Sequence, residues 1–158
     1  MASERKYNIL YVDDEESNLR IFKMAFKRDY NVFTAISGQE AIEVLAKEQV
    51  QLIITDQKMP EMSGTEFLEK TLPEFRDVIR IILTGFSDIE AVVRAVNKAN
   101  IYKYVTKPWD REAFKEIIDE ALALYQYRAD KDLKIADLET ENQALKAKIF
   151  DLEQKYKI

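Results

Sequence analysis

The sequence predicts an α/β protein with a doubly wound, five-stranded parallel sheet, and three observations support this fold class. Short apolar segments rich in β-branched and aromatic residues recur along residues 7–125 and are typical of strands. Several are apolar with little alternation, as expected where helices cover both faces of a parallel sheet. Segments with helical spacing of apolar residues follow each of them, and this alternation favours right-handed β-α-β crossovers.

The expected strands are residues 7–12, 31–35, 50–55, 78–83 and 101–106. Five apolar stripes mark the helices: Leu19, Phe22 and Phe26; Ala41, Ile42 and Leu45; Phe67 and Leu68; Ile89, Val92, Val93 and Val96; and Phe114, Ile117, Ile118 and Ala121. Together these elements predict one domain over residues 1–125, and residues 126–158 form a separate helical extension.

Composition excludes several classes of chemistry. The chain has no cysteine and no histidine, which excludes disulfides, thiolate metal sites and imidazole bases or ligands within it. Its 29 acids exceed its 24 bases, so we expect no direct contact with nucleic acid, which requires concentrated positive charge. The first residues, "MASERKYNIL", do not resemble a signal peptide, and no apolar segment approaches the ~20 residues that span a membrane. We therefore expect a soluble, cytoplasmic protein.

Polar residues follow four of the expected strands. Asp13 and Asp14 end the first strand, Asp56 the third, Thr84 the fourth and Lys107 the fifth. In open α/β sheets, ligands bind beyond the carboxyl ends of the strands. Clustered carboxylates without histidine or cysteine suit Mg²⁺, and a carboxylate can act as a nucleophile toward phosphorus. Asp56 is the natural nucleophile, with Lys107 and Thr84 available for phosphoryl oxygens.

Each of these residues also has an ordinary structural interpretation. The acids at 13–16 favour the start of a helix, where the helix dipole stabilises negative charge. Asp56 is a turn former, Thr84 ends a strand, and Lys107–Pro108 is a common joint between strand and helix. The functional interpretation depends on the whole set meeting at one edge of the sheet.

The motifs "YVDDE", "IITDQKMPEMSG", "ILTGFSD" and "YKYVTKPW" occur in this order. With them, residues 7 to about 125 resemble a receiver domain of the response regulators of bacterial two-component systems, which has a flavodoxin-like fold. The resemblance implies a phosphorylation-dependent switch, and no enzyme beyond its own Mg²⁺-dependent phosphoryl acceptance and autodephosphorylation. Because the chain has no histidine, the donor is a sensor histidine kinase, a phosphotransfer protein or a small molecule.

The resemblance also implies roles for individual residues. Asp14 ligates Mg²⁺ directly, Asp13 directly or through a water, and the backbone carbonyl of Lys58 completes the protein ligands. Asp56 accepts the phosphoryl group and is also a metal ligand.

Residues of the last two strands bind the phosphoryl group in this family. By the same resemblance, Thr84 and Lys107 hold its oxygens, and the Lys107–Pro108 bond is cis. Tyr104 matches the family's switch aromatic, although a half-buried strand tyrosine is an equally good interpretation. The resemblance also implies that the side chains two residues after Asp56 and Thr84, here Lys58 and Phe86, tune the rate of phosphate loss.

A heptad pattern predicts that the last helix continues into a parallel, two-stranded coiled coil that forms a homodimer. Its core positions are Ile135, Asn142 and Ile149 (a), and Leu138, Leu145 and Leu152 (d). The flanking pairs Lys134–Glu139, Glu141–Lys146 and Lys148–Glu153 are opposite in sign. The same frame places Arg128 and Lys131 at core positions, so residues 126–132 form either a hinge or a slight change of phase. The alternative is a solvated helix folded back on its own domain.

Two other functions compete with the switch. One is a Mg²⁺-dependent phosphohydrolase with an aspartyl-phosphate intermediate. Enzymes of this kind that resemble haloacid dehalogenases have a general acid two residues after the nucleophile, where this sequence has Lys58, which counts against this function. The other is a receiver-like scaffold that is constitutively dimeric, which would not need the clustered acids. We expect an output domain outside this sequence; the alternative is a complete regulator that acts through partners.

Overall fold

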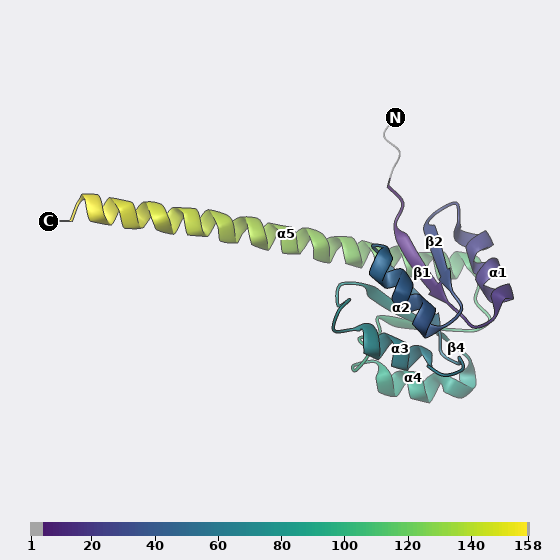
Figure 1. Cartoon of the computed structure of the whole chain (residues 1–158). Coiled ribbons are helices and arrows are strands. Elements are labelled where there is room, and N and C mark those ends of the chain that lie inside the picture. Colours follow the sequence, from purple (N-terminus) through teal and green to yellow (C-terminus); the bar gives the residue numbers. More distant parts are fainter. Residues whose placement is uncertain (1–4, 158) are drawn as a thin grey trace. The chain divides into compact units, whose positions relative to one another are not determined.

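The computed structural model describes residues 5–157 and has the predicted order of elements (Figure 1). The strands are β1 (Asn8–Val12), β2 (Asn31–Ala35), β3 (Leu52–Asp56), β4 (Ile79–Thr84) and β5 (Lys103–Thr106). The helices are α1 (Glu16–Phe26), α2 (Gly38–Lys47), α3 (Gly64–Thr71), the 3-10 helix η1 (Phe86–Asp88), α4 (Ile89–Ala95) and α5 (Arg111–Lys155). The predicted fold class is confirmed: a flavodoxin-like five-stranded sheet with a long final helix.

All strands of the sheet are parallel, in the order β2-β1-β3-β4-β5. The order reverses at β1, since β2 lies on one side of it and β3 on the other. This switch point is where open α/β sheets bind ligands, beyond the carboxyl ends of the strands. The register pairs Val12 with Thr55 and Asp56 with Leu83. The ends of β1, β3 and β4 therefore meet at one edge.

The sheet separates two apolar cores. Ile9 and Tyr11 of β1 face a cluster with α1 and the start of α5, whereas Leu10 and Val12 face a cluster with α2, α3 and α4. Alternate residues of a strand point to opposite faces, and both faces are covered here, which explains the nearly continuous apolar strands of the sequence. One residue of the predicted helical stripes differs. Val93 is half exposed, whereas Val92 of α4 is buried and Val96, just after the helix, packs against the same core.

Serine caps explain where two of the helices begin. The hydroxyl of Ser37 accepts a hydrogen bond from the backbone N–H of Glu40 at the start of α2. Ser63 and Glu66 repeat this arrangement at the start of α3. Each serine satisfies a backbone donor that has no partner within the helix, and each glutamate favours the positive end of the helix dipole.

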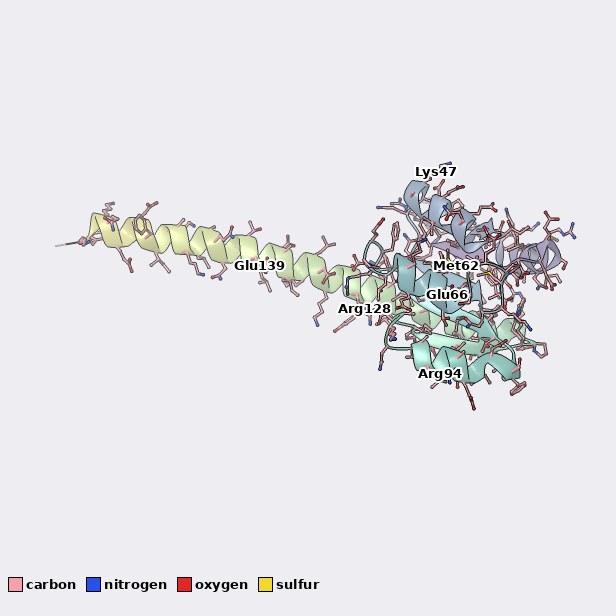
Figure 2. All side chains as sticks on the ribbon, turned by 60° about the horizontal axis from the view of Figure 1, so that its bottom comes forward. Lys47, Met62, Glu66, Arg94, Arg128 and Glu139 are labelled. Atoms are coloured by element: carbon pink, nitrogen blue, oxygen red, sulfur yellow. The ribbon has the colours of Figure 1, made fainter. Side chains whose placement is uncertain are left out.

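The chain divides into two compact units, of which the first ends at Tyr125 and the second begins at Gln126. Helix α5 contributes to both units, and Phe114 and Ile118 of its first part are buried in the core. In the second unit the apolar residues at the predicted a and d positions are 45–56% exposed, Ile135 the least and Leu145 the most. Figure 2 shows side chains of this stretch, Glu139 among them, radiating from the helix. Within residues 5–157, no helix is long and apolar enough to cross a membrane.

Gly64, the first residue of α3, lets this helix approach the end of β3. A Cβ atom at this position would lie 2.3 Å from the backbone oxygen of Asp56, and the N–H of Gly64 donates a hydrogen bond to the carbonyl of Gln57. Backbone atoms cannot move away as a flexible side chain can, so only glycine fits here without a shift of β3 or α3. Gly85 differs, since a Cβ there would meet no atom within 4 Å.

We predict that Gly64→Ala lowers the free energy of unfolding by about 1–3 kcal/mol, the usual cost of forcing an extra carbon into a packed site. Urea denaturation followed by circular dichroism measures this. The matched control is Gly85→Ala, which is expected to stay within about 0.5 kcal/mol of the parent chain. Equal stabilities of the two variants would contradict the close contact.

Candidate functional site

Three carboxylates gather at the carboxyl edge of the sheet. Asp13 and Asp14 follow β1, Asp56 ends β3, and one oxygen of each lies within 4.8 Å of the others. Asp13 and Asp56 are buried, whereas Asp14 is half-buried. The sequence predicted this cluster from the strand ends alone. Because oxygen is the ligand that hard divalent cations prefer, this donor set fits Mg²⁺.

Both oxygens of Asp13 are held by hydrogen bonds. The hydroxyl of Tyr11 donates to Oδ2 and the backbone N–H of Glu15 donates to Oδ1, each over 3.0 Å. Burial, together with the nearby charge of Asp13, raises the pKa of Tyr11 well above its usual value. The Tyr11 ring stacks on Phe22 of α1, with ring centres 4.2 Å apart. Tyr11 therefore remains a donor and fixes the orientation of the Asp13 carboxylate.

Asp56 forms an ion pair with the ammonium of Lys107. Burial raises the pKa of Asp56, Lys107 opposes this rise, and the charges of Asp13 and Asp14 add to it. One lysine thus faces three carboxylates in a partly desolvated site. The excess negative charge favours a further cation, in agreement with the oxygen-only donor set.

Thr84 lies at the end of β4, next to the strand that carries Asp56. Its side chain is buried, and its hydroxyl donates a hydrogen bond to the carbonyl of Gly85 over 3.1 Å. The backbone carbonyl of Thr84 accepts from the N–H of Lys107 over 3.0 Å. This bond continues the pairing of β4 with β5 and brings Lys107 to the same edge as Asp56.

The remaining predicted residues differ in exposure. Tyr104 of β5 is 40% exposed, and Phe86 of η1 is 80% exposed. Lys58 is exposed two residues after Asp56. The Lys107–Pro108 peptide bond is cis.

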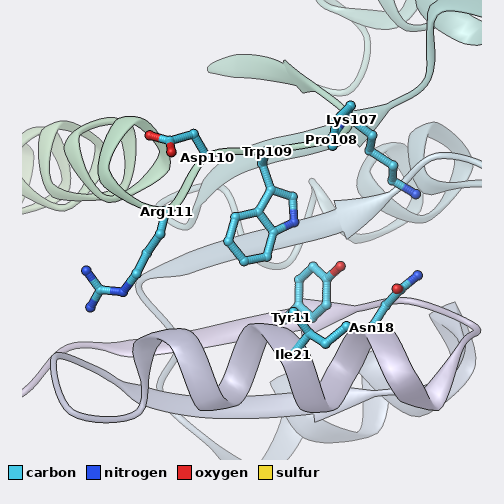
Figure 3. A pocket seen from close by; sticks show the side chains of 8 residues that line it. All are labelled: Tyr11, Asn18, Ile21, Lys107, Pro108, Trp109, Asp110 and Arg111. Atoms are coloured by element: carbon cyan, nitrogen blue, oxygen red, sulfur yellow. The ribbon is translucent and has the colours of Figure 1, made fainter.

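A pocket of about 660 Å³ opens beside the site, between α1 and the connection from β5 to α5 (Figure 3). Asn18 and Ile21 line it from α1, residues 107–110 line it from the connection, and Arg111 lines it from the start of α5. Trp109 lies in its wall with the hydroxyl-bearing ring of Tyr11 nearby.

Sequence reasoning missed Tyr11 and Gly64 as parts of this site. Side chains two positions apart in a strand point to the same face, and Tyr11 precedes Asp13 by two positions. That spacing could have identified the Tyr11 hydroxyl as a hydrogen-bond donor to Asp13. Nothing local to Gly64 indicates its contact with Asp56, since the two residues meet only when α3 packs against the end of β3.

Comparison with known proteins agrees with this geometry. Residues 9–119 match the family described as response regulator receiver domain. A chemotaxis protein CheY homologue of Campylobacter jejuni is 34% identical in an alignment of 119 positions that covers 72% of this chain and 91% of the homologue. The hydrogenase transcriptional regulatory protein HoxA of Cupriavidus necator is 28% identical over 91% of this chain, which spans only 30% of HoxA.

Solved structures agree as well. A structure described as adenylate cyclase from Rhodopirellula baltica superposes with a TM-score of 0.77 at 29% identity, over 81% of this chain and 96% of that one. The family match covers more than half of the chain and includes every strand end at which the carboxylates, the threonine and the lysine lie. Residues 9–119 thus identify this chain as a member of the response regulator receiver family of two-component signalling.

Proposed function

We propose that this chain is a phosphorylation-dependent switch in which Asp56 accepts a phosphoryl group from a histidine of a kinase or phosphotransfer protein. The observation that carries the proposal is the buried Asp56 carboxylate, grouped with Asp13 and Asp14 within 4.8 Å and paired with Lys107. In the reaction an Asp56 oxygen forms a bond to phosphorus while the phosphorus–nitrogen bond of the donor breaks, with its electron pair going to the imidazole. The donor lies outside this chain, which has no histidine.

Asp13, Asp14, Asp56 and the backbone carbonyl of Lys58 would hold the Mg²⁺ ion of this site. When bound, the ion supplies positive charge against the clustered carboxylates and the phosphoryl oxygens. Tyr11 supports this role, since a donor that orients a metal-binding carboxylate strengthens metal binding.

Lys107 and Thr84 would bind the phosphoryl oxygens once Asp56 is modified. Lys107 already contacts Asp56, so its ammonium is positioned to neutralise the added charge. The Thr84 hydroxyl would exchange its bond to the Gly85 carbonyl for a phosphoryl oxygen. In this proposal the partly exposed ring of Tyr104 turns inward when Thr84 moves. The result is a population shift on the surface formed by α4, β5 and the start of α5.

The second unit would join two copies of the chain through a parallel coiled coil. Support comes from the heptad pattern and from the exposure of Leu138 and Leu145, which a single copy leaves without cover. Asn142 at an a position favours two strands in register. We propose that this dimer relays the signal in the cytoplasm to an output domain or partner outside this sequence. HoxA, described as a transcriptional regulatory protein, extends well beyond the region of similarity.

We predict that acetyl phosphate with Mg²⁺ adds the mass of one phosphoryl group to the chain and that Asp56→Asn abolishes this gain. Intact-protein mass spectrometry measures it, and Asp77→Asn, an exposed acid outside the carboxylate cluster, is the matched control. Persistence of the modification in Asp56→Asn would exclude Asp56 as the acceptor. Sustained release of phosphate over many turnovers would favour a phosphohydrolase instead.

We predict that Tyr11→Phe raises the dissociation constant for Mg²⁺ roughly tenfold, because Asp13 loses the donor that orients it. Isothermal titration calorimetry of the full chain gives this constant. Tyr102→Phe, which removes a hydroxyl from a partly exposed ring outside the cluster, is expected to leave it unchanged. The orienting role would be wrong if both variants bound Mg²⁺ as the parent does.

One chain has a mass of 18.5 kDa. We predict that it sediments as a dimer and that Leu145→Glu converts the dimer to a monomer. A charge at a d position would be buried in the seam, whereas the neighbouring Ala144→Glu lies outside it and serves as control. Sedimentation with Mg²⁺ alone and with added beryllofluoride distinguishes a constitutive dimer from one that forms on activation. A monomer in both states would overturn the coiled coil.

A further inference from the structure

The second unit carries another uncharged row of side chains, away from the predicted a and d seam. We call it the outer stripe; it consists of the b and f positions Ala129, Leu133, Ala136, Thr140, Gln143, Ala147, Phe150 and Gln154. Spacings of three and four place these residues on one face of α5, roughly 150° around the helix from the seam. Leu133 and Phe150 are its large apolar members, 65% and 60% exposed.

A two-stranded coiled coil does not account for this stripe. The b and f positions of such a coil face solvent, where an isolated dimer normally carries charged residues. Here the charged side chains between residues 129 and 154 fall at other heptad positions, and the stripe stays free of them. Dimerisation through the seam would leave Leu133 and Phe150 uncovered, so the helix has a second face suited to a packing partner.

Acids border the outer stripe on both sides. Along one side, at the c positions, lie Asp130, Asp137 and Asp151; along the other, at the e positions, lie Asp132, Glu139 and Glu153. Lys146 is the one base in these two rows. Among the residues that the structure describes, no salt bridge engages any of these acids.

The proposed dimer would use only some of these charges. Glu139 and Glu153 would meet Lys134 and Lys148 of the second copy across the seam. The c-position acids have no such counterpart, because c positions point away from the seam. Asp130 accepts a hydrogen bond from the Gln126 side chain over 2.9 Å, but no base pairs with these acids among the described residues, so their charge can attract a basic ligand.

We propose that the outer stripe is a docking surface for an amphipathic helix of a different protein, with an apolar face bordered by lysine or arginine. Leu133 and Phe150 would pack against its apolar residues, and the c-position acids would pair with its bases. A second copy of this chain fits poorly, since two outer stripes face to face would bring acidic borders together. The proposal goes beyond the receiver function and rests on the proposed dimer, which would cover the seam and leave the outer stripe uncovered.

The test uses designed, fluorescein-labelled peptides and fluorescence anisotropy with the full chain. The first peptide is a helix with leucine and alanine on one face and lysine on both borders. The second has the same composition with the apolar residues dispersed, and the third replaces lysine by glutamate. We expect the first peptide to bind at least tenfold more tightly than the second, and the third not to bind.

Variants of the chain then separate the contribution of apolar packing to peptide binding from the contribution of charge pairing. Leu133→Gln/Phe150→Gln is expected to weaken binding of the first peptide at least tenfold, whereas Tyr127→Gln, an exposed aromatic off the stripe, changes nothing. Asp130→Asn/Asp137→Asn/Asp151→Asn should weaken binding and reduce its dependence on salt. Circular dichroism and sedimentation of these variants are expected to match the parent, since none of the positions belongs to the seam.

Four results would overturn the proposal. They are absence of binding, equal binding of the dispersed peptide, binding that survives Leu133→Gln/Phe150→Gln, and self-association beyond a dimer that this double variant abolishes. The last result would assign the stripe to a second copy. Asp56→Asn is expected to bind the peptide normally, so failure of the switch would be distinguishable from failure of the docking surface.

Discussion

Repulsion among three carboxylates at one edge of the sheet is the constraint on which the rest of this structure depends. Charges a few ångströms apart interact strongly where water is partly excluded, and Asp13 and Asp56 are both buried. The fold opposes this repulsion with specific groups: the ammonium of Lys107 at Asp56, and the Tyr11 hydroxyl and a backbone N–H at Asp13. The remaining imbalance is what makes the edge receptive to a metal ion and then to an added phosphoryl group.

The connection that carries Lys107 is fixed on both of its sides. Trp109 packs within an aromatic cluster of Phe22, Phe26 and Phe114, which joins α1 to the start of α5. Two residues later, Arg111 binds Asp29 and the carbonyl of Ala25. A change at Lys107 is therefore separated from α5 by only a few well-anchored residues. This gives a physical route from the acidic edge to the helix that continues into the second unit.

Sequence alone determined the order of the elements, the residues at the strand ends and the heptad pattern of the tail. These features depend on the period of apolar residues and on the rule that parallel strands end at one edge. Asp13, Asp14 and Asp56 could be brought together by that rule without knowledge of any side-chain contact. The spacing of apolar residues likewise assigns the a and d positions of the heptad pattern. These positions form an interface only when a second chain packs against them.

Only the tertiary structure decided which groups meet. Arg80 is an example, since nothing in "VIRIIL" indicates a fully buried arginine, yet its Nη1 donates to the carbonyls of Phe75 and Val78. Burial without a carboxylate partner among the described residues lowers its pKa to about 10. The pairing of Lys107 with Asp56 and the contact of Gly64 with the end of β3 belong to the same class. Lys107 and Asp56 come from segments that are distant in sequence. In all three cases the arrangement is set by the packing of whole elements, which local patterns do not encode.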